Sequence, residues 1–144
     1  MRLVIQRVEN TSVKVKGNMV GEITKGLFVL LGIKKGDTEK SAEELAEKLS
    51  KLRVMADKED KMNLSVKDVG GEILVVSQFT LYADTKGGNR PSFIQAGEPE
   101  TAKKIYKHFI SQLREKGIKV ETGSFGDYME ISAELDGPVT IILE

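Results

Sequence analysis

The stretch Leu27-Phe28-Val29-Leu30-Leu31 is an unbroken apolar run that follows the turn sequence Thr24-Lys25-Gly26. A short apolar run bounded by turn residues is typical of a β-strand that is buried on both faces. Residues 73–76, Ile-Leu-Val-Val, follow the pair Gly70-Gly71 and form a second run of this kind. The sequence therefore predicts two core strands.

Strand patterns continue on both sides of these runs. Residues 3–8 alternate with a period of two, and Val13 and Val15 do so again before the turn pair Gly17-Asn18. Residues 20–23 are the expected return strand. Further strands are predicted at residues 53–56, 119–121, 129–135 and 139–143, with Asp136-Gly137-Pro138 as a tight turn between the last two.

Two segments have the period of an amphipathic helix. Ser41 and Glu44 predict a capping box at the start of the first helix. Pro99 suits the first turn of the second helix, and Gly117 suits its end. The apolar positions that recur at helical spacing are Ala42, Leu45, Ala46, Leu49 and Leu52 in the first, and Ala102, Ile105, Tyr106, Phe109, Ile110 and Leu113 in the second.

Runs of strands with one helix in each half predict an α+β fold. We expect a curved, barrel-like, mainly antiparallel sheet with two amphipathic helices. The length of 144 residues fits a single domain over residues 1–144.

Composition excludes several classes of protein. Lys and Arg number 22, as do Asp and Glu, so the formal net charge of zero excludes a strongly basic nucleic-acid-binding protein. The chain has no Cys and one His, which excludes a disulfide scaffold, a thiolate nucleophile and a multi-histidine metal site. No apolar run approaches the roughly 20 residues of a membrane helix, and residues 1–10 do not resemble a signal peptide. A cytoplasmic location is expected.

Few residues stand out as catalytic candidates. His108 lies off the apolar face of the second helix, which predicts a partly exposed surface histidine and argues against a Ser-His-Asp triad. Asp136 is best explained as a turn residue before Gly137-Pro138. No phosphate-binding glycine motif is present, so no nucleotide cofactor is expected.

The segment Ser77-Gln78-Phe79-Thr80 is the strongest candidate, because it places polar side chains directly after a core strand. Its residues can be simple turn formers. Alternatively, backbone N–H groups at such a bend can form an oxyanion hole.

Two short motifs, Ser77-Gln78-Phe79-Thr80-Leu81 and Gly137-Pro138-Val139-Thr140, occur in this order in the chain. With Met1-Arg2, Lys61-Met62-Asn63-Leu64-Ser65 and Gly88-Asn89-Arg90-Pro91-Ser92-Phe93, they give a chain that closely resembles the D-aminoacyl-tRNA deacylase (D-tyrosyl-tRNA deacylase) family over almost its whole length.

The resemblance implies a homodimer that hydrolyses the ester between a D-amino acid and the 3′ end of tRNA, without a metal or nucleotide cofactor. It implies a cis Gly137-Pro138 pair that is inserted into the pocket of the partner subunit. The backbone of this pair would exclude L side chains, so glycyl-tRNA would be hydrolysed in part. Arg7 would help to hold the Gly-Pro loop; a surface or interface salt bridge is its alternative role.

The same resemblance places Ser77, Gln78 and Phe79 on the other side of the pocket. Thr80 is either the nucleophile or a positioning group that acts beside the 2′-OH of the tRNA ribose; the absence of a nearby His or Lys motif favours the second role. Phe125 and Met129 would flank the terminal adenosine, with core packing as the alternative.

The chain departs from the family pattern at Leu135, where Asn is common, and at Asp127-Tyr128, which puts fine substrate preference in doubt. Binding of tRNA would need local positive charge. Lys103, Lys107 and Arg114 share one face of the second helix, and Lys34, Lys35, Lys86 and Arg90 lie in predicted loops. Solvated surface cations are the alternative for each.

Two other functions fit the same segments. A non-catalytic RNA-binding module would bind D- and L-aminoacyl-tRNA equally without turnover. A hydrolase of free amino-acid esters or D-peptides would act on small esters without RNA.

Overall fold

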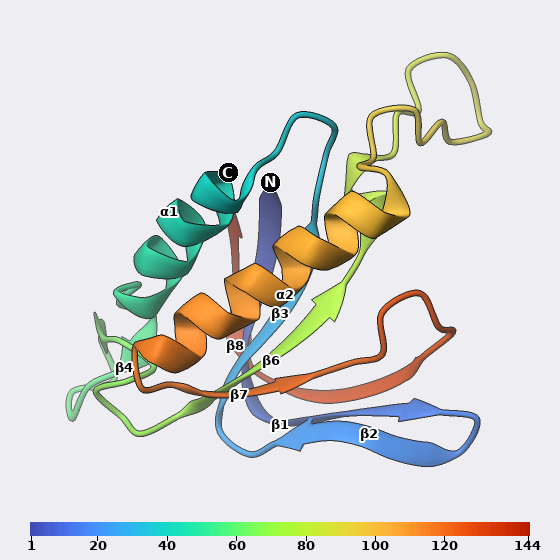
Figure 1. The fold of residues 1–144 in the computed structure, drawn as a ribbon. Coiled ribbons are helices and arrows are strands. Elements are labelled where there is room, and N and C mark those ends of the chain that lie inside the picture. The colour runs from blue at the N-terminus through green and yellow to red at the C-terminus, as the bar shows by residue number, and fades with distance from the viewer.

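The computed structural model describes residues 1–144, and its sheet is organised around one long strand, β1 (Arg2–Val15). One edge of β1 pairs antiparallel with β3 (Gly26–Gly32) and then with β2 (Asn18–Ile23). The other edge pairs antiparallel with β8 (Glu130–Leu143). The sheet continues from β3 to β6 (Glu72–Ser77) and β7 (Lys119–Thr122), and β7 returns to contact β2 (Figure 1). The predicted α+β fold with a barrel-like sheet is confirmed.

Two of the strand pairings are parallel. β3 pairs with β6, and β6 pairs with β7, in the same direction. Parallel neighbours need a crossover, and each crossover here contains a helix. The first contains α1 (Glu39–Ser50) and the small hairpin of β4 (Met55–Ala56) and β5 (Met62–Leu64). The second contains α2 (Pro99–Glu115), and the two helices lie side by side over one face of the sheet (Figure 1).

The strands β3 and β6 are buried on both faces, as their apolar runs predict. Leu27, Val29 and Leu31 face the larger core beneath the helices, and Phe28 faces a smaller core on the other side of the sheet. β6 divides in the same way, since Ile73 and Val75 belong to the larger core and Leu74 and Val76 to the smaller one. The inside of the barrel is therefore filled by side chains.

Gly26 lies in close contact with the backbone of β6. A Cβ built on Gly26 would lie 1.9 Å from the carbonyl oxygen of Glu72. Real Cβ atoms do not come so near a backbone oxygen, so the two strands can pair at this point only because residue 26 has no side chain.

The helix periodicities are confirmed except at Leu52, which lies beyond the end of α1, and the predicted capping box is wrong. Helix α1 begins at Glu39, and its N-cap is Thr38, whose hydroxyl accepts from Ser41 N at 3.4 Å. Ser41 is therefore the third residue of the helix, and its side chain accepts in turn from Thr38 N. Pro99 starts α2 as predicted. Neither helix is long and apolar enough to cross a membrane.

The predicted turn between two C-terminal strands is also corrected. β8 is one strand, and Leu135 and Thr140 pair with Val8 and Gln6 of the same partner, β1. The residues between them bulge outward without reversing the chain direction. A 14-residue β1 is long enough to pair with both halves, so Asp136-Gly137-Pro138 forms an excursion within one strand. Most side chains of β8 before residue 139 are exposed, while Leu143 is buried.

Candidate functional site

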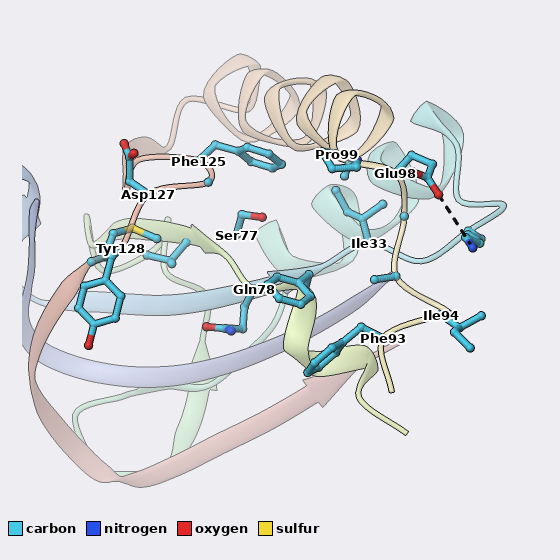
Figure 2. A pocket seen from close by; sticks show the side chains of 18 of the residues that line it. Ile33, Ser77, Gln78, Phe93, Ile94, Glu98, Pro99, Phe125, Asp127 and Tyr128 are labelled. Atoms are coloured by element: carbon cyan, nitrogen blue, oxygen red, sulfur yellow. Dashed lines mark ion pairs between the residues drawn. The ribbon is translucent and has the colours of Figure 1, made fainter. Parts of the chain in front are cut away.

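A cavity of about 720 Å³ opens where the parallel strands β3 and β6 end. Ser77, the last residue of β6, pairs with Leu31, one residue before the end of β3, so the segments that follow the two strands begin at the same edge of the sheet. The start of α2 and the segment between β7 and β8 form the other walls (Figure 2). The volume lies within the range of sites for small ligands and cofactors, ~300–1,000 Å³.

Ser77, Gln78 and Phe79 line this cavity. Gln78 N donates to Leu31 O at 2.9 Å, which continues the β3–β6 pairing by one residue. The chain then turns into a short 3₁₀ helix, η1 (Phe79–Tyr82). Because the first N–H groups of a helix have no acceptor within it, the amides at the start of η1 are available to a ligand.

Thr80 lies on η1 beside the cavity but does not line it. Its hydroxyl oxygen accepts a hydrogen bond from the side-chain amide of Gln78. No basic side chain makes a hydrogen bond to it. His108 is far along α2 and pairs with Glu43 of α1 at 2.8 Å, as expected for a partly exposed surface residue.

Phe125 and Met129 line the opposite wall of the cavity, from the segment that joins β7 to β8. The Phe125 ring packs on Tyr106 with ring centroids 5.6 Å apart, and Met129 packs against the smaller core. Tyr106 is itself held by a hydrogen bond from its hydroxyl to Val75 O at 2.8 Å. Each of the two wall residues therefore has both a packing role and a face toward the cavity.

Arg7, Gly137 and Pro138 do not line the cavity of their own chain. Arg7 Nε lies 2.8 Å from Asp136 Oδ2, and another guanidinium nitrogen donates to Val54 O at 2.9 Å. Arg7 thus ties the start of the β8 excursion to the body of the protein. The Gly137-Pro138 bond is cis, and a Cβ on Gly137 would lie 2.3 Å from Val139 N.

The model of the D-Tyr-tRNA(Tyr) deacylase family matches residues 4–144, nearly the whole chain. The chain belongs to this family. Curated relatives named "D-aminoacyl-tRNA deacylase" are 52% identical in Thermosipho melanesiensis, 53% in Aquifex aeolicus and 54% in Clostridium perfringens. Each comparison covers 100% of this chain and 97% of the relative.

Two solved structures have the same fold. One, named "c-Myc DNA Unwinding Element Binding Protein", has a TM-score of 0.93 at 43% identity and covers 100% of this chain and 98% of its own. The other, described as a probable eukaryotic D-amino acid tRNA deacylase, has a TM-score of 0.83 at 17% identity, with 99% of this chain and 97% of the other covered. The second similarity concerns the fold alone.

Within this deacylase-family chain, the mouth of the cavity contains residues that sequence reasoning missed. Phe93 packs edge-on against Phe79, with ring centroids 5.0 Å apart, and Ile94 lies beside it (Figure 2). Tyr128, already singled out in the sequence as a departure from the family pattern, stands opposite and is 91% exposed. Loops have no hydrophobic period, so the available signal was an isolated apolar pair, Phe93-Ile94, in a polar segment.

Most of the cavity wall is apolar or carries neutral hydrogen-bonding groups, and its charged side chains are Lys35, Glu98 and Asp127. No group of three or more His, Cys, Asp or Glu side chains is placed to hold a metal ion. Lys35 and Glu98 form a loose ion pair of 3.9 Å at one edge. Behind the strand ends, burial together with Asp37 raises the pKa of Tyr82 to about 12, so its phenol stays neutral. The site can bind a flat apolar group and polarise a carbonyl.

Proposed function

We propose that this chain hydrolyses the ester bond between a D-amino acid and the 3′ end of tRNA, as a proofreading enzyme of translation in the cytoplasm. The observation that carries the proposal is the cavity between the Ser77-Gln78-Phe79 strand end and the Phe125–Met129 wall. It lies in a chain that is 52–54% identical to curated deacylases over its full length.

The terminal adenosine fits the wall formed by Phe125 and Met129. An aromatic ring offers a face on which an unpaired base stacks, and the Met side chain adapts to the other face. Tyr106 fixes the orientation of the Phe125 ring from behind. The ester would then face the end of β6.

The oxyanion of the tetrahedral intermediate would form at the start of η1. Gln78 N already donates a hydrogen bond to Leu31 O, so the amide of Phe79, which lines the cavity at the start of η1, is the better donor. Removal of one preorganised N–H donor of this kind typically costs about 2.7–4 kcal/mol of transition-state stabilisation. Water would be the nucleophile, with the ribose 2′-OH assisting it.

Thr80 fits a positioning role better than that of a nucleophile. Its hydroxyl oxygen accepts from the amide of Gln78, and no base is present to take its proton. A Thr80→Ala variant is expected to keep measurable deacylation, and Thr80→Ser to be close to wild type. Complete loss in Thr80→Ala with a covalent D-aminoacyl adduct on the wild-type protein would favour nucleophilic catalysis.

We assign the remaining wall of the site to a second copy of the chain. Gly137 and Pro138 project from β8 and are exposed, and Arg7 holds the excursion at its base. Exposed apolar side chains lie on the same strand, at Ile131, Leu135 and Ile142. In a homodimer, the backbone of Gly137-Pro138 would enter the partner's cavity. It would exclude an L side chain and leave a D side chain directed outward.

The first experiment compares D-tyrosyl-, L-tyrosyl- and glycyl-tRNA as substrates and follows release of the labelled amino acid. We expect rapid loss of the D form, little loss of the L form, and partial loss of the glycyl form, which has no side chain to exclude. Equal rates for D and L would contradict selection by the Gly-Pro backbone.

Mixing two inactive variants tests whether the site is shared between subunits. Gly137→Ala distorts the excursion, and Gln78→Trp fills the cavity. In a shared site, a co-expressed heterodimer has one site with both defects and one with neither. Activity of about one quarter of the wild type should therefore return in the mixture. No recovery in a mixture that contains heterodimer would place each complete site within one chain.

A binding protein without turnover is the second candidate, because the relative at 43% identity is named for binding a DNA element. Equal retention of D- and L-aminoacyl-tRNA, with neither hydrolysed, would support it.

A further inference from the structure

The basic side chains on one side of helix α2 are paired with carboxylates, and those on the other side are not. On the side toward α1, Lys104 lies 3.1 Å from Glu39, and His108 lies 2.8 Å from Glu43. Lys116, just after the helix, pairs with Glu47, and this pairing helps to lower the pKa of Glu47 to about 2. These basic side chains connect the two helices.

On the other side, Lys103, Lys107 and Arg114 have no carboxylate within ion-pair distance. They lie within about 40° of one another around the helix, in a stripe about 16 Å long, given 100° and 1.5 Å per residue. Arg114 donates to Val120 O at 2.8 Å, which orients its guanidinium and leaves other N–H groups free. Glu115 is the one acidic residue that lines the groove beside them, and its oxygens accept from Ser111 and Gln112.

These cations line a groove of about 830 Å³ between α2 and residues 122–125. Phe125 lines both this groove and the deeper cavity. A molecule whose end group stacks on Phe125 can therefore leave the cavity along the groove without crossing the protein interior. The groove is lined mostly by polar and charged side chains, unlike the cavity, so it suits a charged chain better than an apolar one.

We propose that this groove binds the phosphates of the unpaired 3′ segment of the substrate RNA, just upstream of the nucleoside in the cavity. The assignment rests on the proposed function, since it needs a nucleoside stacked on Phe125. Unpaired cations in a row bind a phosphate backbone without reading its bases. Lys103 and Lys107 would contact successive phosphates, while Arg114 would contact one nearer the base-paired stem.

The test compares the wild type with Lys103→Glu/Lys107→Glu. Both lysines are exposed and have no hydrogen-bond or ion-pair partner in the protein, so the variant is expected to fold. The matched control is Lys48→Glu/Lys58→Glu, which changes the net charge equally at exposed, unpaired lysines outside both the cavity and the groove. Two assays are used: deacylation of D-tyrosyl-tRNA and of D-tyrosyl-adenosine, and binding of a short RNA that carries the 3′-terminal sequence of tRNA.

For the groove variant we expect KM for D-tyrosyl-tRNA to rise about tenfold with kcat unchanged. The affinity for the short RNA should fall by a similar factor. The slope of log affinity against log salt concentration should become shallower by about 1.4, as expected for two lost phosphate contacts. Hydrolysis of D-tyrosyl-adenosine, which has no phosphate, should be unchanged. The control should match the wild type in every assay.

RNA binding that is equal in the groove variant and the wild type would overturn the assignment, as would an equal loss in the control. An equal loss on D-tyrosyl-adenosine would also overturn it. Absence of deacylation by the wild type would refute the proposed function instead, and RNA binding would still decide whether the groove holds phosphates.

Discussion

The strands β6 and β8 belong to one sheet, yet they are built in opposite ways. In β6, residues 73–75 are fully buried and serve two cores. In β8, nearly every side chain from residue 130 to 138 is exposed, although its backbone pairs with β1 over most of the strand. Backbone pairing thus holds a strand in place without burying it. The residues of β8 are consequently free to serve contacts outside the chain.

The largest effect on stability is expected in the buried half. Leu27→Ala removes a fully buried side chain from the larger core, so the free energy of unfolding should fall by about 2–5 kcal/mol. Leu135→Ala on β8 is the matched exposed change and should alter it by less than about 0.5 kcal/mol. Denaturant unfolding at low protein concentration measures both. A similar loss of unfolding free energy in the two variants would contradict the difference in burial between the two strands.

Arg7→Lys, a change beside the exposed part of β8, should lower activity strongly and stability only slightly. Lys keeps the charge but cannot make both the paired contact with Asp136 and the hydrogen bond to Val54 O. We expect deacylation of D-tyrosyl-tRNA to fall by up to about 100-fold, because the Gly-Pro segment loses its anchor. The loss of unfolding free energy should stay near about 1 kcal/mol. Wild-type activity in this variant would remove Arg7 from the site.

Tyr106→Phe tests a polar contact to the buried strand. The hydroxyl that donates to Val75 O is lost, but Gly123 N also donates to this oxygen, at 3.1 Å. The acceptor therefore keeps one partner, and the unfolding free energy should fall by only about 1 kcal/mol. Deacylation should be unchanged, since the ring behind Phe125 remains. A loss above that of Leu27→Ala would show that hydrogen bonding, not apolar burial, dominates this half.

The smallest effect concerns pH. A hydrogen bond from Lys119 lowers the pKa of Glu72 at the start of β6, and Thr24 N adds to this. A carboxyl with a lowered pKa stabilises the fold above its ordinary pKa of 4.5, and this stability is lost as pH falls through the lowered value. At pH 7 the free energy of unfolding of the wild type should exceed that of Glu72→Gln by about 0.5 kcal/mol. In acid this difference should vanish. A constant difference at all pH values would exclude this ion pair as the cause.

Sequence patterns predicted the elements whose burial determines the order of their residues. Burial on both faces of a strand gives an unbroken apolar run, as at residues 27–31 and 73–76, and burial of one face of a helix gives apolar residues at helical spacing. Thr38 was missed as the N-cap because Ser41 has the same capping chemistry three residues later. The two candidates for the N-cap differ only in backbone conformation, since Thr38 is extended and Ser41 is already helical.

The site was predicted in part, for a related reason. Ser77, Gln78 and Phe79 come at the end of the apolar run of β6, so their place at a strand end could be predicted from the sequence. Phe93 and Ile94 come from a loop, whose position depends on contacts distant in sequence. The continuity of β8 through Gly137-Pro138 was hidden as well, since Asp-Gly-Pro normally signals a turn, and only pairing with β1 shows otherwise.

The close approach of β3 and β6 at Gly26 also affects how a survey of single substitutions would read. Position 26 lies at the end of β3 away from the cavity, yet any side chain there would collide with the backbone of Glu72. It should therefore tolerate substitution as poorly as the residues that contact substrate. A map of intolerance alone would mark Gly26 as functional, and only a measurement of folded protein for each variant would separate an architectural requirement from a catalytic one.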